Sequence, residues 1–196
     1  MTGFEAALRE ATDHLTRAGV RFALIGGLAV SARTEPRFTR DADLAVAVES
    51  DVEAEAVIRD LRRHHYEVDT VVEQAAAGRL ATVRLRRHTG NDAPVLDLLF
   101  ASSGIEPEIV QAAEILEILP DLRIPVAGTG HLIALKVLSR DDDERPQDIV
   151  DLRALLKIAT PSDRDRARES LRLITSRGFN RSRDLLAALA ALTPGR

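Results

Sequence analysis

The sequence predicts an α/β protein of the α+β kind, with an N-terminal mixed sheet flanked by helices and a C-terminal bundle of helices. Two observations predict this fold. Short apolar runs of strand character alternate with helical periodicity up to about residue 127, and helical periodicity alone continues from there. The chain has 196 residues, 45% of them hydrophobic, so it can bury a core of this kind. We therefore expect two domains, residues 1–127 and 128–196.

The N-terminal part alternates between the expected strands and helices. The chain begins with an amphipathic helix, for which Thr2 and Glu5 form a capping box and Gly19 follows the end. Further helical periodicity covers residues 28–33 and 51–65. The apolar positions of the second of these helices include Val52, Ala56 and Leu61. The segments of strand character are 21–25, 43–48, 67–73, 79–87, 94–100, 114–119 and 122–127.

The C-terminal part is expected to be helical and basic. Its helical segments are 131–140, 147–159, 163–177 and 181–192, with Thr160, Pro161 and Gly178 as caps and breaks. Residues 161–196 carry eight arginines and four acidic residues, although the whole chain has a net charge of −4. A basic surface favours contact with nucleic acid, and it is equally typical of a solvated helix face.

The composition excludes several kinds of protein. The chain has no cysteine, which excludes disulfides, a thiolate zinc site and a cysteine nucleophile. The neighbours His64 and His65 are the one close histidine pair along the sequence, and successive side chains point in different directions. No apolar run approaches the length of a membrane span, and the first residues lack the pattern of a signal peptide. We expect a cytoplasmic protein with no membrane partner.

Two aspartates one residue apart, Asp41 and Asp43, enter the second strand segment. In a strand they project from the same face, where their charges repel unless a cation lies between them. Mg²⁺ or Mn²⁺ is the natural ion, because such ions bind carboxylates and phosphates together. Most such pairs are only polar residues at the edge of a strand. A third aspartate, Asp97, lies inside the apolar run "PVLDLLF", where a carboxylate is costly unless a cation, an arginine or backbone amides satisfy it.

The glycine pair Gly26 and Gly27 follows a buried strand and precedes a short helix. Backbone N–H groups there can approach a phosphate without a side chain in the way. Carboxylates for a metal on one side and a glycine turn on the other suit a nucleoside triphosphate held for phosphoryl-type transfer. The chain contains no Walker loop, and a glycine pair alone indicates only a tight turn.

These motifs together resemble a known group of enzymes. The glycine pair, the stretch "RFTRDAD" from Arg37 to Asp43 and the later Asp97 resemble the polymerase-beta-like nucleotidyltransferase superfamily. Within it, "ALIGGLAV" and "LIALKVLSRDDDERPQDIVDLRALL" resemble the AbiEii/MenT group of toxin nucleotidyltransferases from toxin–antitoxin systems, the mycobacterial MenT toxins above all. The resemblance covers roughly Arg21 to Leu156, and it implies that residues 1–127 form the catalytic domain.

The resemblance implies a role for each carboxylate. Asp41 and Asp43 would bind the metal ions that bridge the triphosphate. Asp97 would be the third metal-binding carboxylate, which in polymerising relatives helps to activate the attacking hydroxyl.

The same group needs a lysine and an aspartate from the second domain. Lys136 matches the lysine and Asp148 the aspartate, with Asp151 as the alternative. Lys136 would neutralise phosphate charge, and Asp148 would orient that lysine or a substrate hydroxyl. Without the resemblance, Lys136 is equally well explained as a helix residue whose ammonium group extends to solvent.

Thr39 shares the face of the two aspartates if the segment is extended. Its hydroxyl would lie near the phosphates, so the candidate nucleotide-binding residues are Gly26, Gly27, Arg37, Thr39 and Lys136. Some toxins of the group are silenced by a kinase-like antitoxin that acts on a hydroxyl at this place. Phosphorylation of Thr39 would add about two negative charges where the triphosphate binds. Thr39 is equally well explained as a β-branched residue that suits an extended segment.

The first functional hypothesis is a toxin that transfers a nucleotide to the 3′ acceptor end of tRNA and so blocks aminoacylation and translation. The nucleotide would be a pyrimidine from CTP or UTP, and the partners would be tRNA and a cognate antitoxin. RNA phosphates would contact one of two arginine patches, either Arg84, Arg86 and Arg87 or the tail residues Arg164, Arg168, Arg172, Arg181 and Arg183. Only 3% of the residues are aromatic, which leaves few platforms for base stacking.

Two other hypotheses remain open from the sequence. In one, the acceptor is a small molecule such as an aminoglycoside, or a protein side chain. In the other, the chain is a catalytically idle nucleotidyltransferase fold that serves as a binding module or an antitoxin. The intact Asp41, Asp43, Asp97 and Lys136 argue against an idle fold.

Overall fold

The structure, a computed structural model, describes residues 3–36, 39, 41–74, 78–87, 95–141 and 146–192. Within these residues the strands form one seven-stranded mixed sheet in the order β3-β4-β5-β2-β1-β7-β6. The strands are β1 (Phe22–Ile25), β2 (Asp41–Val46), β3 (Tyr66–Gln74), β4 (Arg79–Arg87), β5 (Val95–Leu99), β6 (Glu114–Leu119) and β7 (Leu122–Val126). The helices are α1 (Gly3–Arg17), α2 (Gly26–Arg33), α3 (Asp51–Arg63), α4 (Glu106–Gln111), α5 (Thr129–Ser139), α6 (Pro146–Ile158), α7 (Pro161–Ser176) and α8 (Leu185–Ala190). The α/β class predicted from the sequence is confirmed.

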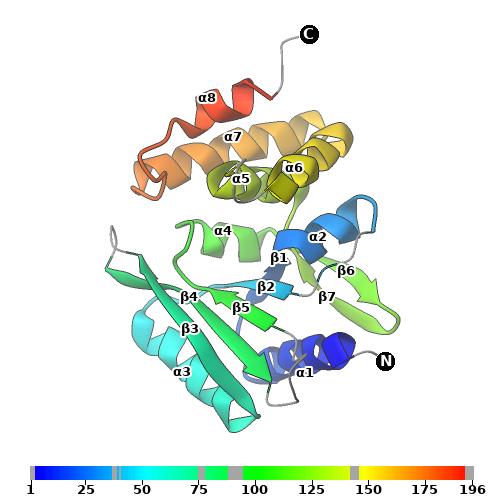
Figure 1. Cartoon of the computed structure of the whole chain (residues 1–196), viewed down its shortest axis with the longest axis vertical. Helices are drawn as coiled ribbons and strands as arrows, with labels where there is room; N and C mark the ends of the chain where they lie inside the picture. Colours follow the sequence, from blue (N-terminus) through cyan, green and yellow to red (C-terminus); the bar gives the residue numbers. More distant parts are fainter. Residues whose placement is uncertain are drawn as a thin grey trace.

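The helices cover both faces of the sheet (Figure 1). α1 and α3 lie on one face, where the Tyr66 hydroxyl donates a hydrogen bond of 3.0 Å to the carbonyl oxygen of Ala7. The C-terminal helices α5 to α8 lie beyond the opposite face, with α2 and α4 between them and the strands. Among the described helices, none has both the length and the apolar character that a membrane span needs.

The centre of the sheet is built from apolar strands that are buried on both faces. β2 pairs with β1 in antiparallel and with β5 in parallel orientation. All four residues of β1 are buried, and so are Leu44, Ala45 and Val46 of β2. Asp97 interrupts this apolar centre in the middle of β5, where it is buried between Leu96 and Leu98.

The helical layer is fixed by close contacts between α5 and α7. α7 begins with a capping box, in which Thr160 Oγ1 accepts a hydrogen bond of 3.1 Å from the Asp163 N–H, and Asp163 Oδ2 accepts one of 2.9 Å from the Thr160 N–H. Gly130 lies in the first turn of α5, and a Cβ there would come within 2.5 Å of the Asp163 carbonyl oxygen. The sequence predicted the Thr160 cap; the close approach at Gly130 is a tertiary feature.

Several boundaries differ from those expected. β2 begins at Asp41 rather than Asp43, and α2 begins at Gly26, so that the glycine pair forms its first turn. α4 was not anticipated, because six residues are too short for a periodic signal. The expected capping residue Thr2 lies outside the described residues.

Two apolar positions expected in α3 were wrong. Val52 is 71% exposed and Ala56 is also exposed. The buried residues of α3 are Ala54, Val57 and Leu61, which follow the spacing of a single helix face. The predicted buried face of α3 was therefore wrong in the first two turns and correct at Leu61.

Candidate active site

A cleft of about 620 Å³ brings most of the predicted site residues together. We call it the central cleft. It is lined by residues from β1 to β5, from α2, α5 and α6, and from the loops after β5 and α7. The predicted site residues that line it are Gly26, Gly27, Asp43, Asp97, Lys136 and Asp148.

The two aspartates Asp43 and Asp97 face each other across neighbouring strands, because the parallel register of β2 and β5 pairs these two residues. Asp41 lies two residues before Asp43 on the same side of β2 and is partly buried. Burial, followed by the negative charges of Asp97 and Asp41, raises the pKa of Asp43 to about 6, although Lys136 and Arg84 act in the opposite direction. The cluster therefore carries negative charge that its neighbours do not fully compensate.

Asp97 is paired with an arginine from the neighbouring strand. Arg84 lies opposite Asp97 in the antiparallel register of β4 and β5. Its Nε and Nη2 donate hydrogen bonds of 2.9 and 2.7 Å to the two carboxylate oxygens. The Asp97 side chain is only 10% exposed, so this bidentate pair satisfies a nearly buried charge. A carboxylate has about four acceptor positions, so Asp97 keeps room for a cation beside Arg84.

The helix α2 begins at the wall of the cleft with a backbone that only glycine fits. Gly26 has a φ of +66°, in the left-handed region, and a Cβ at this position would lie 1.9 Å from Asp43 Oδ2. Ile25, the residue before the helix, provides no side-chain cap. Within the described residues, the first N–H groups of α2 are thus left without a side-chain acceptor, in an arrangement that suits an anion.

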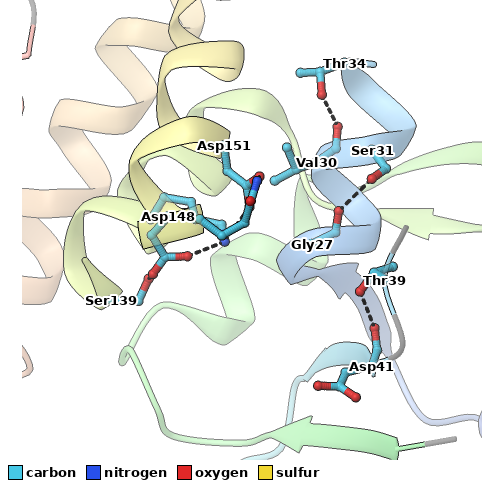
Figure 2. A network of polar contacts seen from close by, with 11 residues as sticks. Gly27, Val30, Ser31, Thr34, Thr39, Asp41, Ser139, Asp148 and Asp151 are labelled. Atoms are coloured by element: carbon cyan, nitrogen blue, oxygen red, sulfur yellow. Dashed lines mark hydrogen bonds and ion pairs between the residues drawn. The ribbon is translucent and has the colours of Figure 1, made fainter. Parts of the chain in front are cut away.

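Lys136 on α5 is held by two aspartates of α6. Its Nζ lies 2.6 Å from Asp148 Oδ1 and 2.8 Å from Asp151 Oδ2. Asp148 also accepts a hydrogen bond of 2.8 Å from Ser139 Oγ, and Asp151 accepts one of 3.0 Å from Gln147 Nε2 (Figure 2). The sequence left Asp148 and Asp151 as alternatives; both contact the lysine, and of the two only Asp148 lines the central cleft.

Thr39 lies beside the start of β2. Its Oγ1 donates a hydrogen bond of 3.3 Å to the carbonyl oxygen of Asp41, and the side chain is partly buried (Figure 2). Neither Thr39 nor Asp41 is among the residues that line the central cleft. Arg37, the other candidate of this segment, lies outside the described residues.

Several arginines of the tail have structural partners. Arg164 Nη2 donates to the carbonyl oxygen of Leu156 at 2.6 Å, and Arg183 Nη1 donates to the carbonyl oxygens of Leu138 and Arg140 at 3.2 and 3.1 Å. These two arginines join the C-terminal helices to one another rather than facing an open surface.

Other arginines of the two expected patches pair with nearby acids. Nη1 of Arg168 lies 2.8 Å from Asp165, and Nη1 of Arg166, which the sequence did not single out, lies 2.8 Å from Glu169. Of the tail arginines that the structure describes, Arg181 alone lines the central cleft. In the second expected patch, Arg86 and Arg87 pair with Asp69 and Glu10 at 3.0 and 2.7 Å.

Sequence reasoning missed two contributions to the site. It treated Arg84 as a possible phosphate contact, whereas the strand register makes it the partner of Asp97. It did not single out Ser139, which holds Asp148. It did name Arg181 as a possible phosphate contact, and this residue reaches the cleft from the loop after α7. The alternating polar face of β4 was a signal for Arg84, but only the register of two strands reveals its partner.

Comparison with protein families gives one match over most of the chain. The model of the family described as "Nucleotidyl transferase AbiEii toxin, Type IV TA system" matches residues 14–191. A comparison with curated proteins gives no match.

Solved structures share the fold. An antigenic nucleotidyltransferase-like protein from Paracoccidioides brasiliensis is 21% identical, with a TM-score of 0.60 over 97% of this chain and 87% of that one. The lincosamide antibiotic adenylyltransferase LnuA, in its lincomycin-bound form, is 16% identical, with a TM-score of 0.51 over 79% and 98%. ANT(2″)-Ia in complex with adenylyl-2″-tobramycin is also 16% identical, with a TM-score of 0.50 over 97% of both chains. At such low identities, these similarities establish a nucleotidyltransferase-like fold only.

Proposed function

The chain belongs to the AbiEii family of nucleotidyltransferase toxins, and we propose that it transfers a pyrimidine nucleotide from CTP or UTP to the 3′ end of tRNA. Such a transfer would block aminoacylation and so stop translation. The observation that carries a transferase is the meeting of Asp43 and Asp97, Lys136 and the uncapped start of α2 at one cleft. Together they offer carboxylates for a cation, an ammonium group and N–H donors for phosphates.

The carboxylates fit Mg²⁺ or Mn²⁺. Asp41 and Asp43 share one side of β2, and Asp97 lies next to Asp43 on β5. Carboxylate oxygens are the ligands that these hard ions prefer. The raised pKa of Asp43 reflects its burial first and then the negative charges of Asp97 and Asp41, which a cation would neutralise. When bound, the ions would polarise the α-phosphate and compensate charge on the leaving pyrophosphate.

The remaining residues would bind and orient the reactants. Gly26 and Gly27 would bring the first N–H groups of α2 to the triphosphate, and Lys136 would contact its phosphate oxygens from α5. Asp97, oriented by Arg84, would accept the hydrogen bond of the attacking 3′-hydroxyl. The new bond joins that oxygen to the α-phosphorus while its proton passes to the Asp97 carboxylate, and the bond from the α-phosphorus to the β-phosphate oxygen breaks to release pyrophosphate.

We propose RNA as the acceptor on the basis of the family and of charge. Arg181 lies at the cleft, on the loop between α7 and α8, where it can meet an acceptor phosphate. The arginines of α7 that pair with Glu169 and Asp165 do not line the central cleft, so we assign them a smaller part. With few aromatic residues, recognition would depend on backbone phosphates and on shape rather than on stacking.

A small-molecule acceptor is the second candidate. LnuA was solved with lincomycin and ANT(2″)-Ia with adenylyl-2″-tobramycin, and both share this fold. The wall of the cleft formed by β3 and β4 carries Thr70, Gln74 and Thr82, whose polar groups suit a hydroxylated acceptor. A protein side chain as acceptor and an idle fold remain outcomes of the same experiment.

Regulation by a kinase-like antitoxin is part of the proposal. The Thr39 hydroxyl lies next to Asp41 at the start of β2. A phosphate on it would place about two negative charges beside the proposed metal ligands and would compete with the triphosphate. The proposed partners are thus CTP or UTP, tRNA and a cognate antitoxin.

Incubation with each of the four labelled nucleoside triphosphates tests these alternatives. Each reaction contains Mg²⁺ and total tRNA, a lincosamide or an aminoglycoside, or no acceptor. Label on tRNA from CTP or UTP supports the proposal, and it should vanish with Asp41→Asn but persist with the matched control Asp165→Asn, whose side chain is 77% exposed. Label on an antibiotic, on the protein itself or on nothing would contradict tRNA as the acceptor.

A further inference from the structure

A cluster of two histidines and an aspartate lies where α1 meets the end of α3. His14 is on α1, Asp60 is on α3, and His64 is the residue that follows α3. His14 Nε2 lies 3.1 Å from Asp60 Oδ2, and one ligand atom from each of the three residues lies within 4.8 Å of the others. The sequence suggested His64 and His65 as neighbours, whereas the fold brings His14, fifty positions away, against His64.

The cluster is separate from the central cleft. α1 and α3 lie on the face of the sheet opposite to the C-terminal helices that carry Lys136 and Asp148 (Figure 1). None of the three residues lines the central cleft. Any ion bound here would therefore be independent of the carboxylates proposed to hold Mg²⁺.

The geometry of the histidines suits coordination. His64 Nδ1 lies 2.9 Å from the carbonyl oxygen of Asp60, and a hydrogen bond from Nδ1–H would leave Nε2 with its lone pair for a metal. Tetrahedral Zn²⁺ spaces its ligand atoms about 3.4 Å apart, close to the distance between His14 Nε2 and Asp60 Oδ2. The two imidazole centroids lie 3.4 Å apart, nearer than two imidazoles bound to one ion, so the rings would move apart as the ion binds.

We propose that His14, Asp60 and His64 bind a transition-metal ion of the Zn²⁺ type, with water in the remaining position. Imidazole nitrogen is a ligand that Zn²⁺, Ni²⁺ and Cu²⁺ prefer and that Mg²⁺ does not. Three protein ligands and one water make an open site. Because the ligands come from two helices, the ion joins α1 to α3 and stabilises the folded chain in proportion to its concentration.

Binding of added Zn²⁺ is measured on the full chain. Metals are first removed with a chelator, and the protein is dialysed into excess Mg²⁺. We expect about one Zn²⁺ per chain by elemental analysis after gel filtration, and a higher unfolding temperature in Zn²⁺ than in chelator. Co²⁺ in place of Zn²⁺ should give visible absorption bands. His14→Ala and His64→Ala should lose all three signals, and the matched control His65→Ala should keep them.

Three further variants make the test decisive. The double variant Asp41→Asn with Asp43→Asn should still bind Zn²⁺, because it alters only the proposed Mg²⁺ ligands of β2. If it loses the ion, or if His14→Ala and His64→Ala bind as the unaltered chain does, the proposed site is wrong. Should an alanine variant fail to fold, as circular dichroism would show, His14→Gln and His64→Gln replace it with a side chain closer in size.

Discussion

Gly26 and Asp43 are in such close contact that a methyl group on the glycine would lie 1.9 Å from the carboxylate oxygen Oδ2. The glycine also has a φ of +66°, which other residues rarely adopt. One position thus fixes both the start of α2 and the place of a proposed metal ligand.

Gly26→Ala should therefore reduce nucleotide transfer and stability together. The backbone strain costs about 1 kcal/mol, and the overlap with Asp43 adds to it or displaces the carboxylate. Gly19→Ala is the matched control, because its φ is +68° and nothing lies within 4 Å of the added Cβ. Thermal unfolding and transfer rates check both variants; equal loss of activity in the two would show that the contact with Asp43 has no role.

Arg84→Gln should lower transfer about 10-fold to 100-fold, because it removes the group that orients Asp97. Arg84→Lys should recover only part of the rate, since lysine cannot form the bidentate pair. Arg86→Gln, which alters a pair with Asp69 outside the cleft, is the control and should keep the full rate. Steady-state kinetics with a metal titration measure the effect, and an unchanged rate in Arg84→Gln would refute the role assigned to this pair.

Removal of charge at Asp43 should stabilise the metal-free protein. The pKa of Asp43 is raised from 3.8 to about 6, so the folded state binds more protons than the unfolded state between these values. Stability therefore falls as the pH rises through this window, and the loss is complete above it. Asp43→Asn should increase the free energy of unfolding by up to about 3 kcal/mol at neutral pH and not at all at about pH 3.

Urea unfolding at several pH values, in the presence of a chelator, measures this change in the free energy of unfolding. Asp165→Asn, an exposed control, should leave the profile unchanged. Mg²⁺ should stabilise the unaltered chain more than Asp43→Asn. A variant less stable than the unaltered chain at neutral pH would contradict the electrostatic interpretation.

Substitutions of Asp148 and Asp151 should have different effects on transfer and on stability. Both contact Lys136, but only Asp148 lines the central cleft. Asp148→Asn should reduce transfer about 100-fold with a modest loss of stability, while Asp151→Asn, at a position 2% exposed, should mainly lower the unfolding temperature. Transfer assays below the unfolding temperature of each variant distinguish the two; equal rates would remove the special role of Asp148.

Thr39 should be the residue modified by a kinase-like antitoxin. Coexpression with the proposed cognate antitoxin should add one phosphate, and intact-mass measurement with peptide mapping should place it on Thr39. Thr39→Val should stay unmodified and escape inhibition, whereas Thr34→Val, at a nearby threonine whose Oγ1 donates to the Val30 carbonyl oxygen, should still be modified. A phosphate on any other residue would overturn this assignment.

Much of the fold could be predicted because its signals are local. β4 alternates Ala81, Val83 and Leu85 with polar residues, and these three are buried as the pattern requires. The resemblance implied that Asp97 joins Asp41 and Asp43 in one site, and the parallel register of β2 and β5 does place Asp97 opposite Asp43.

What escaped prediction depends on register and on contacts far apart in the sequence. Arg84 becomes the partner of Asp97 only through the register of β4 and β5, and a shift by one residue would turn it to the other face. The approach of His14 to His64 depends on how α1 and α3 pack, which neither helix encodes alone.

Mapping of tRNA 3′ ends by mass spectrometry tests the central claim most directly. After incubation with CTP or UTP and Mg²⁺, we expect tRNA extended at its 3′ end by pyrimidine nucleotides with the unaltered chain, and unextended tRNA with Asp41→Asn. Two results would contradict the proposed function. One is tRNA that stays unextended with every nucleoside triphosphate although the protein is folded. The other is extension that persists in Asp41→Asn.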